Sequence, residues 1–538
     1  MHRNFTRENR ETLLGTRTGN TEGRWEKAMS YKTQVSVSRE SYGVVVPTKQ
    51  PNESQGGPKE VVEGRALTKE KTKQPNSCRT QSRESETSGL ERVREAARGS
   101  KEMKFTALLH HITVGRLRSS YFSLKKNAAA GVDGVTWQEY GDGLEDRLVD
   151  LHGRIHRGAY QAKASRRVWI PKADGRERPL GIAALEDKVV QHAVVVVLNS
   201  IWEEDFEGFS YGFRQGRSQH DALDALYVGI TRQKVNFIVD LDIRSFFDKV
   251  GHEWMEKFVR HRVEDERLIR LIQKWLKAGV MEDGQWFESE EGTPQGAVIS
   301  PVLANLYLHY VLDIWVTPWR RKVARGDVIA VRYADDAVLG FQYQADAERF
   351  LADLKDRLQK FGLELHPDKT RLIEFGRYAA ERREKRGEGK PETFNFLGFT
   401  HICGKNHKTG YFMVLRKTMR RRIATKLKDV RQKLRVRMHE SIKGMVAWLK
   451  SVVRGYSQYH AVPGNEDRLK TFRYEVLRSW YRTLRRQSQK SRWTWERFNE
   501  RLGNQISQVE ILHPYPDVRF ASSHPNFGRN IQGKNRVR

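Results

Sequence analysis

The segment Tyr333–Asp336 constrains the fold more than any other, because two adjacent aspartates lie between two apolar runs. Residues 328–331 precede the pair and residues 337–341 follow it, so the pattern predicts a strand, a tight turn and a second strand. Neighbouring carboxylates beside buried strands repel each other unless a cation neutralises them. A hard divalent ion such as Mg²⁺ suits such a pair, whereas the alternative is a solvated hairpin tip.

A second acidic segment supplies the other arm of a metal site. Residues 237–241 are apolar except for Asp240 and predict a short strand, which Asp242 follows directly. A site for phosphoryl transfer with two metal ions needs carboxylates that come from different strands. Asp242 with Asp335 and Asp336 meets this requirement.

A phosphate-binding pair of cations is expected on another hairpin. Residues 166–182 predict two strands around a turn at Asp174 and Gly175, and Lys172 and Arg178 flank that turn. A hairpin would bring the two side chains together, where they could bind a triphosphate as a point charge and a fork. The alternative is an ordinary solvated hairpin.

Composition favours a polyanionic partner. The 538 residues, enough for about two to four domains, carry 97 Lys and Arg against 67 Asp and Glu, a net charge of +30. The only cysteines, Cys78 and Cys403, exclude a disulfide framework and favour a reducing compartment. The sequence contains neither a run of apolar residues long enough to span a membrane nor a secretory signal.

A strongly basic helix is expected after residue 414. Met419, Ile423, Leu427, Val430 and Leu434 recur at helical spacing, and only Asp429 opposes the basic residues around them. One dominant sign of charge favours contact with a polyanion, and the apolar face lacks the aromatic anchors of a membrane-surface helix. The candidate RNA contacts are Arg416, Arg420, Arg421, Lys428 and Arg431.

Several segments occur in an order that resembles the reverse transcriptase family, specifically the bacterial group II intron-encoded reverse transcriptase/maturase proteins. The similar segments are residues 131–136, 170–182, 210–214, 242–248, 293–301, 333–336, 362–370 and 394–399. Residues 454–460 look like the thumb or maturase signature of this family. Each motif is weak alone, but eight in order are highly specific.

The resemblance implies an α+β fold: a right-hand polymerase with fingers and an antiparallel palm sheet, followed by an all-α basic thumb. We expect residues 1–100 to be disordered and order to begin near Met103. The remaining boundaries are a helical extension over 101–160, fingers and palm over 161–400, the thumb over 410–500, and a basic segment over 501–538 without an HNH endonuclease domain.

The same resemblance implies roles for individual residues. Asp242, Asp335 and Asp336 would hold two Mg²⁺ ions with the backbone carbonyl of Ile243, and Asp335 is the stronger candidate of the adjacent pair. The other expected roles are triphosphate contact (Lys172, Arg178), screening of the sugar 2′ position (Phe247), lining of the nucleotide pocket (Gln295) and protonation of pyrophosphate (Lys369).

The expected activity is RNA-directed DNA synthesis on group II intron RNA, with binding of that RNA to assist splicing and retrohoming. The implied partners are intron RNA, a DNA primer or target and deoxynucleoside triphosphates, in the bacterial cytoplasm and without a membrane. A homodimer stays open. The alternatives are a splicing maturase without polymerase activity and another bacterial reverse transcriptase of the retron or defence type.

Overall fold

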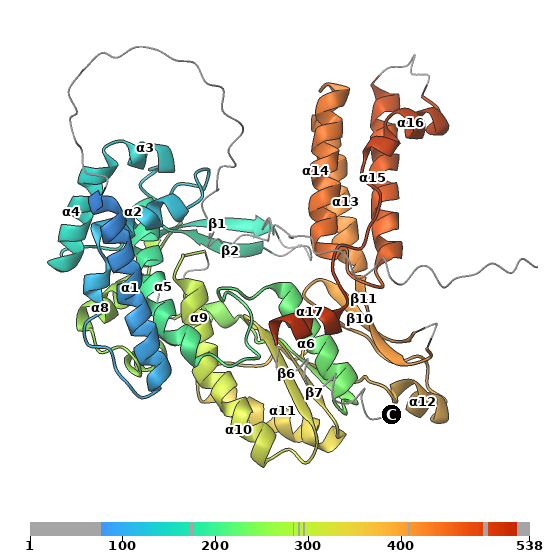
Figure 1. The fold of residues 1–538 in the computed structure, drawn as a ribbon, viewed down its shortest axis with the longest axis horizontal. Coiled ribbons are helices and arrows are strands. Elements are labelled where there is room, and N and C mark those ends of the chain that lie inside the picture. The colour runs from blue at the N-terminus through green and yellow to red at the C-terminus, as the bar shows by residue number, and fades with distance from the viewer. Residues whose placement is uncertain are drawn as a thin grey trace, which may run out of the picture. The chain divides into compact units, whose positions relative to one another are not determined.

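The computed structural model describes residues 77–171, 177–282, 284–288, 291–293, 296–406, 409–487 and 493–524, all within one compact unit of the chain. Helices and strands are mixed over most of the chain, and a group of long helices lies to one side of them (Figure 1). Among these residues, no helix has the length and apolar character needed to cross a membrane.

The central sheet has the strand order β6-β7-β3-β8, and all its pairings are antiparallel. The strands are β3 (Phe237–Leu241), β6 (Val328–Tyr333), β7 (Asp336–Phe341) and β8 (Arg371–Glu374). The hairpin and strand predicted from the two acidic segments are therefore confirmed.

The two faces of this sheet are both covered. Val239, Leu339 and Phe341 pack into the large core that also contains the buried residues of α11 (Gln344–Gln359). Ile238 and Val338 belong to a different core, shared with α6 (Gln219–Arg232). Alternate residues of a strand point to opposite faces, so a sheet buried on both sides needs the continuous apolar runs seen in the sequence.

A second sheet, in the order β2-β1-β4-β5, contains the hairpin predicted at residues 166–182. Strands β1 (Ser165–Pro171) and β2 (Glu177–Ile182) pair antiparallel, and the turn between them lies outside the described residues. The other two strands are β4 (Val280–Glu282) and β5 (Gln285–Phe287). The apolar run at residues 193–198 lies in helix α5 (Leu185–Asp205), which is buried on nearly all sides.

The prediction of disorder is wrong for residues 77–99, which form helix α1 (Ser77–Gly99). Leu90 and Ala97 are buried in the large core, and Arg98 Nε donates to the Glu204 carboxylate on α5 at 3.0 Å. Two buried residues are enough to attach one face of an otherwise polar helix, which hydrophobic content alone does not reveal. The helices that follow are α2 (Val114–Ser123), α3 (Trp137–Gly141) and α4 (Leu144–His156).

Further helices surround the sheets. They are α7 (His252–Arg260), α8 (Glu266–Leu276), α9 (Ser300–Leu308), α10 (Ile314–Lys322) and α12 (Ala379–Lys385). Strands β9 (Phe394–Phe396), β10 (Phe399–Lys405) and β11 (Phe412–Thr418) make a third sheet in the order β11-β10-β9.

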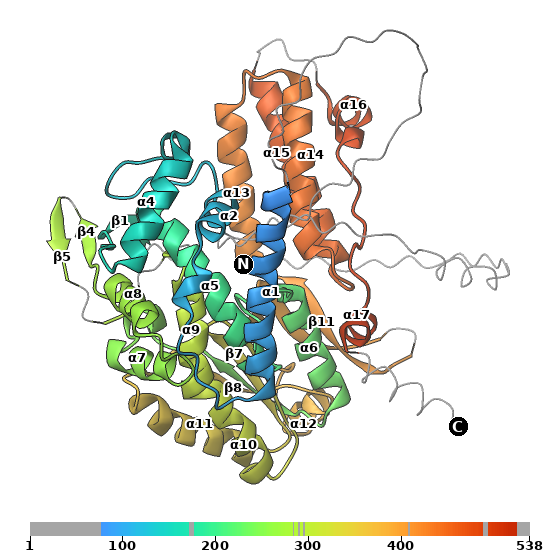
Figure 2. The ribbon, with the colours of Figure 1, turned by 60° about the vertical axis from the view of Figure 1, so that its left-hand side comes forward.

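The predicted thumb forms around its own core. Helices α13 (Arg420–Val436), α14 (Ile442–His460) and α15 (Glu466–Arg486) lie side by side (Figures 1 and 2) and share a cluster that includes Leu427, Leu449 and Trp480. Helix α16 (Trp495–Arg501) packs on this cluster through Phe498. Helix α17 (Pro516–Ser523) returns to the palm, where Arg519 pairs with Asp224 on α6.

Buried histidines make the stability of this fold dependent on pH. Burial lowers the pKa of His309, His401 and His460 to about 3 in each case, so the folded chain holds them neutral. The unfolded chain binds protons at these sites below a pH of about 6.5, so the stability that they provide is lost as pH falls from there toward about 3.

We therefore expect the melting temperature to fall between pH 7 and pH 5, with each of these histidines costing roughly 2 kcal/mol at pH 5. His401 stacks on Phe394 with ring centroids 4.7 Å apart, so His401→Phe keeps an aromatic ring there. Thermal unfolding at both pH values should show a smaller decrease for this variant than for the parent chain. Equal decreases would contradict the assignment.

Candidate active site

The three predicted aspartates converge at one end of the central sheet. Asp335 lies in the two-residue turn between β6 and β7, and Asp336 begins β7. Because Leu241 pairs with Ala337 in the antiparallel register, Asp242 follows β3 next to Asp336. Ala334 adopts a left-handed conformation at φ +57°, which sets the sharp reversal of the chain.

Electrostatics show that these carboxylates are crowded. The Asp336 side chain is exposed to solvent on one side. Burial by the surrounding protein atoms nevertheless raises its pKa to about 7, and the negative charges of three neighbouring carboxylates, Asp335, Asp242 and Asp240, contribute to this rise. Burial likewise raises the pKa of Asp335, against the opposing charge of Arg178. Burial also raises the pKa of Asp240 to about 6, although that carboxylate pairs with Arg371 at 3.5 Å.

Lys369 lies beside Asp242. Its Nζ donates to Asp242 Oδ2 at 3.0 Å, and the lysine side chain remains half exposed. A cation that binds Asp242 would have to replace this ammonium group. The structure thus places a positive charge directly on one of the predicted metal ligands.

The donor set fits a divalent cation in its chemistry, since carboxylate oxygens are the ligands that Mg²⁺ prefers. Three of these carboxylates raise the pKa of Asp336, a repulsion that a bound cation would relieve. Among the described residues, however, no three His, Cys, Asp or Glu side chains are gathered into a ready ligand cluster.

The other predicted nucleotide contacts are only partly described. The positive charge of Arg178 on β2 opposes the rise in the pKa of Asp335. Phe246 is buried in the core, while Phe247 stays partly exposed beside it, with ring centroids 5.3 Å apart. Ile243 forms an isolated antiparallel β-bridge with Leu365. Lys172 and Gln295 lie outside the described residues.

A buried network that sequence reasoning missed holds the catalytic turn. Arg332 is 1% exposed and donates through Nη1 to the Ala334 carbonyl at 2.9 Å. Its Nε donates to Asp313 Oδ1 at 2.7 Å, and its other donors reach Asn305 Oδ1 and Ser210 Oγ. The available signal was a charged residue inside an apolar strand, which requires a buried partner.

Gly212 also fixes the turn through close contact. A Cβ atom at this position would lie 2.2 Å from the Ala334 nitrogen and 2.8 Å from the Tyr333 carbonyl carbon. Asn305 Nδ2 donates to the Gly212 carbonyl at 2.6 Å. Only glycine leaves room for the backbone of the turn, which accounts for its place in the 210–214 motif.

The prediction that Arg416 contacts RNA is wrong. It lies in β11 rather than in the basic helix, is 1% exposed, and donates to Asp224 Oδ1 at 2.9 Å. Arg420, Arg421 and Lys428 are exposed on α13. Arg431 is exposed as well, but it pairs with Glu475 on α15 at 3.1 Å.

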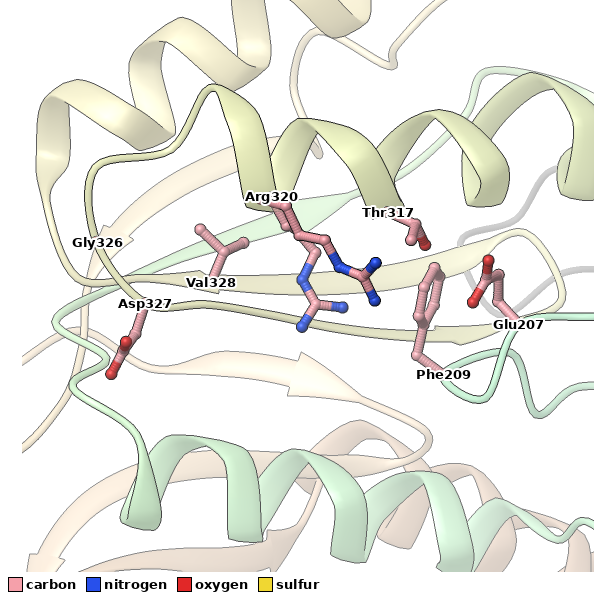
Figure 3. Close-up of a pocket in the computed structure, with 8 residues that line it drawn as sticks. Glu207, Phe209, Thr317, Arg320, Gly326, Asp327 and Val328 are labelled. Carbon is pink, nitrogen blue, oxygen red and sulfur yellow. The ribbon is translucent and has the colours of Figure 1, made fainter.

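A pocket of about 290 Å³ lies at the edge strand β6, and Figure 3 shows the residues that line it. Its two arginines, Arg320 and Arg321, are matched in number by Glu207 and Asp327. None of the three predicted aspartates is among its lining residues. Its other lining residues are Phe209, Thr317, Gly326 and Val328.

An antiparallel sheet that carries three carboxylates at one end, together with a separate sheet that contains the β1–β2 hairpin, is typical of the palm and fingers of a nucleic-acid polymerase. The family model described as reverse transcriptase (RNA-dependent DNA polymerase) matches residues 170–401. Protein YkfC of Escherichia coli (strain K12) is 36% identical over 300 residues, which cover 48% of this chain and 77% of that protein.

Other relatives carry intron-related names. The group II intron-encoded protein LtrA of Lactococcus lactis subsp. cremoris is 34% identical over 241 residues, 44% of this chain and 39% of LtrA. The uncharacterized 91 kDa protein in the cob intron of Schizosaccharomyces pombe is 26% identical over 424 residues, 67% of this chain and 51% of that protein.

The chain belongs to the reverse transcriptase family, and part of it is similar to the group II intron-encoded protein LtrA. The expected α+β polymerase fold is confirmed. The chain spans only 39% of LtrA and 51% of the cob-intron protein.

The Arg332 network leads to a first prediction for the site. Asp313→Asn should leave the buried guanidinium without its counter-ion and cost about 3 to 5 kcal/mol of stability. Thermal or urea unfolding would measure this loss. Asp356→Asn, at an exposed position of α11, should change the stability by less than about 0.5 kcal/mol. A similar small change in both variants would show that the ion pair does not support the fold.

The close contact at Gly212 leads to a second prediction for the site. Gly212→Ala should push the catalytic turn out of place and reduce nucleotide incorporation at least about tenfold, because small misplacements of reacting groups are costly. Gly208→Ala is the matched control, since a Cβ atom there has no neighbour within 4 Å. Single-nucleotide primer extension would compare the two. Equal rates would mean that the backbone contact does not position the turn.

Proposed function

We propose that this chain is an RNA-directed DNA polymerase that copies group II intron RNA and also binds that RNA to assist splicing and retrohoming. The observation that carries the proposal is the convergence of Asp242, Asp335 and Asp336 at the end of the palm sheet. The reverse transcriptase match and the intron-encoded relatives support the choice of template.

The reaction is transfer of a nucleotide to a primer. The primer 3′ oxygen bonds to the α-phosphorus of a deoxynucleoside triphosphate, and the bond from that phosphorus to pyrophosphate breaks. Asp242, Asp335, Asp336 and the Ile243 carbonyl would hold two Mg²⁺ ions. When bound, these ions would supply activation of the 3′-hydroxyl and neutralisation of the phosphate charge.

The other residues would position the substrates. Arg178, whose charge reaches Asp335, would contact the triphosphate together with Lys172. The partly exposed ring of Phe247 would lie against the sugar and exclude a 2′-hydroxyl, while Gln295 would line the same pocket. Lys369 would release Asp242 when a cation binds and give a proton to the departing pyrophosphate.

The thumb would hold the RNA. Arg420, Arg421 and Lys428 are exposed on α13, and among the described residues they form no ion pair that would occupy their charge. Guanidinium and ammonium groups that lack carboxylate partners are available for phosphate oxygens. Because the proposed template and target are intron RNA and DNA, the chain would work in the bacterial cytoplasm with these nucleic acids.

Primer extension on an RNA template tests the proposal. Extension should require Mg²⁺, and Asp335→Ala should reduce it more than about a hundredfold, as removal of charge-stabilising groups does in other active sites. Asp356→Ala, exposed on α11, is the control and should extend like the parent chain. An Asp335→Ala chain that copies RNA at the parent rate would refute the active-site assignment.

A splicing assay run in parallel separates the two activities. Asp335→Ala should still promote intron splicing, because the expected RNA contacts lie on the thumb and not among the aspartates. A parent chain that promotes splicing but never extends a primer would be a maturase without polymerase activity. Extension without any effect on splicing would indicate a reverse transcriptase of another type.

A further inference from the structure

One face of α15 carries a stripe of arginines and aromatic rings that the active site does not use. Its members recur every three or four residues and share one side of the helix. The opposite side of α15 is buried in the thumb core through Phe472, Val476, Trp480 and Leu484. The stripe consists of Tyr474, Arg478, Tyr481, Arg482 and Arg485.

The charge of this region has a single sign. From Val476 to Trp495 the sequence contains six basic residues and no Asp or Glu. Arg478 has a carboxylate neighbour, Glu475 at 3.4 Å, whereas Arg482, Arg485 and Arg486 form no ion pair within the described part of the chain. Clustered cations without counter-ions repel each other, and a bound polyanion would relieve that repulsion.

Aromatic rings stand beside these cations. Trp495 on α16 lies between Tyr474 and Tyr481, with ring centroids at 5.8 Å and 5.4 Å and near-perpendicular planes. Tyr474 is 50% exposed, so a large ring face is left in water. The Arg485 guanidinium lies 5.9 Å from the Tyr481 ring centroid.

The arginines and the aromatic rings line one hollow of about 590 Å³, a volume within the usual range for small-molecule sites. We call it the α15–α16 hollow. Its lining residues are Tyr474, Arg478, Tyr481, Arg482, Arg485, Arg486 and Trp495. Helix α16, which contributes Trp495, lies at the end of the thumb helices that is far from the palm sheet (Figures 1 and 2).

We propose that the α15–α16 hollow binds a short unpaired stretch of RNA. The arginines would bind backbone phosphates as bidentate donors, and the rings of Tyr474 and Trp495 would stack on unpaired bases. The inference deepens the proposed function, because it rests on RNA being the partner. It adds a contact surface on α15 and α16 to the one expected on α13.

Simpler explanations account for only part of this arrangement. Basic residues in the last turn favour the helix macrodipole, which explains Arg485 and Arg486 but not Arg478 and Arg482, which lie further from the helix end. An acidic protein segment would use the arginines but would leave the exposed Tyr474 ring without a planar partner. Duplex RNA would contact the arginines, but its bases are paired and stacked inside the helix.

Binding by the full chain tests the proposal, with fluorescence anisotropy of a short unstructured RNA and of a short RNA duplex at the same salt concentration. Arg482→Ala/Arg485→Ala should weaken binding of the unpaired RNA about tenfold. The matched control is Arg349→Ala/Lys355→Ala, which removes two exposed charges from α11. The control should reduce the affinity less than about twofold.

Tyr474→Ala tests stacking separately, because it leaves every charge in place. It should weaken binding of unpaired RNA about fivefold and leave duplex binding nearly unchanged. An RNA that contains 4-thiouridine should crosslink to peptides that include Tyr474 or Trp495. Circular dichroism would confirm that each variant is folded.

The outcomes decide between occupants. Equal losses in the two double variants, or no effect of Tyr474→Ala on unpaired RNA, would overturn the proposal. Displacement of the RNA by polyglutamate at equal charge concentration would also overturn it, in favour of an acidic protein segment. Primer extension by the parent chain is scored separately, so a failure of the polymerase proposal is distinguishable from a failure at the hollow.

Discussion

The buried ion pair between Arg332 and Asp313 is the interaction on which the site depends. Both side chains are almost fully excluded from solvent, at 1% and 0% exposure, so each charge requires the other. The same guanidinium binds the Ala334 carbonyl in the catalytic turn and Ser210 Oγ in the segment beside β6. Arg332 thus links strand β6 to Asp313, which directly precedes α10, and to the turn that carries Asp335.

These contacts matter because repulsion between the carboxylates destabilises the turn. Asp335, Asp336 and Asp242 repel one another, and without support the turn would relax to separate them. Arg332 holds the turn from beneath, and Gly212 allows a second segment to press against its backbone. Buried hydrogen bonds from Arg332 therefore hold the turn that carries Asp335 and Asp336 at the end of the sheet where Asp242 follows β3.

Acidic and basic side chains are concentrated in different parts of the chain. The palm concentrates acids at one end of its sheet, whereas the thumb presents cations on α13 and on the α15–α16 hollow. The thumb also has a core separate from that of the palm. In the proposed function, the thumb would attract a polyanionic template that the bare aspartates repel, so RNA binding and nucleotide transfer would take place on different elements.

The palm hairpin, strand β3, the fingers hairpin and the amphipathic helix α13 were predictable from the sequence, because each depends on local periodicity and turn residues. The sequence also identified the aspartates through motif order. The tertiary structure alone decided the roles of buried polar residues. Arg416 looked like part of a basic helix, but its position in β11 points it inward to Asp224. Arg332, Asp313 and Gly212 gained their roles through contacts between segments distant in the sequence, and helix α1 was fixed by packing that local hydrophobicity does not reveal.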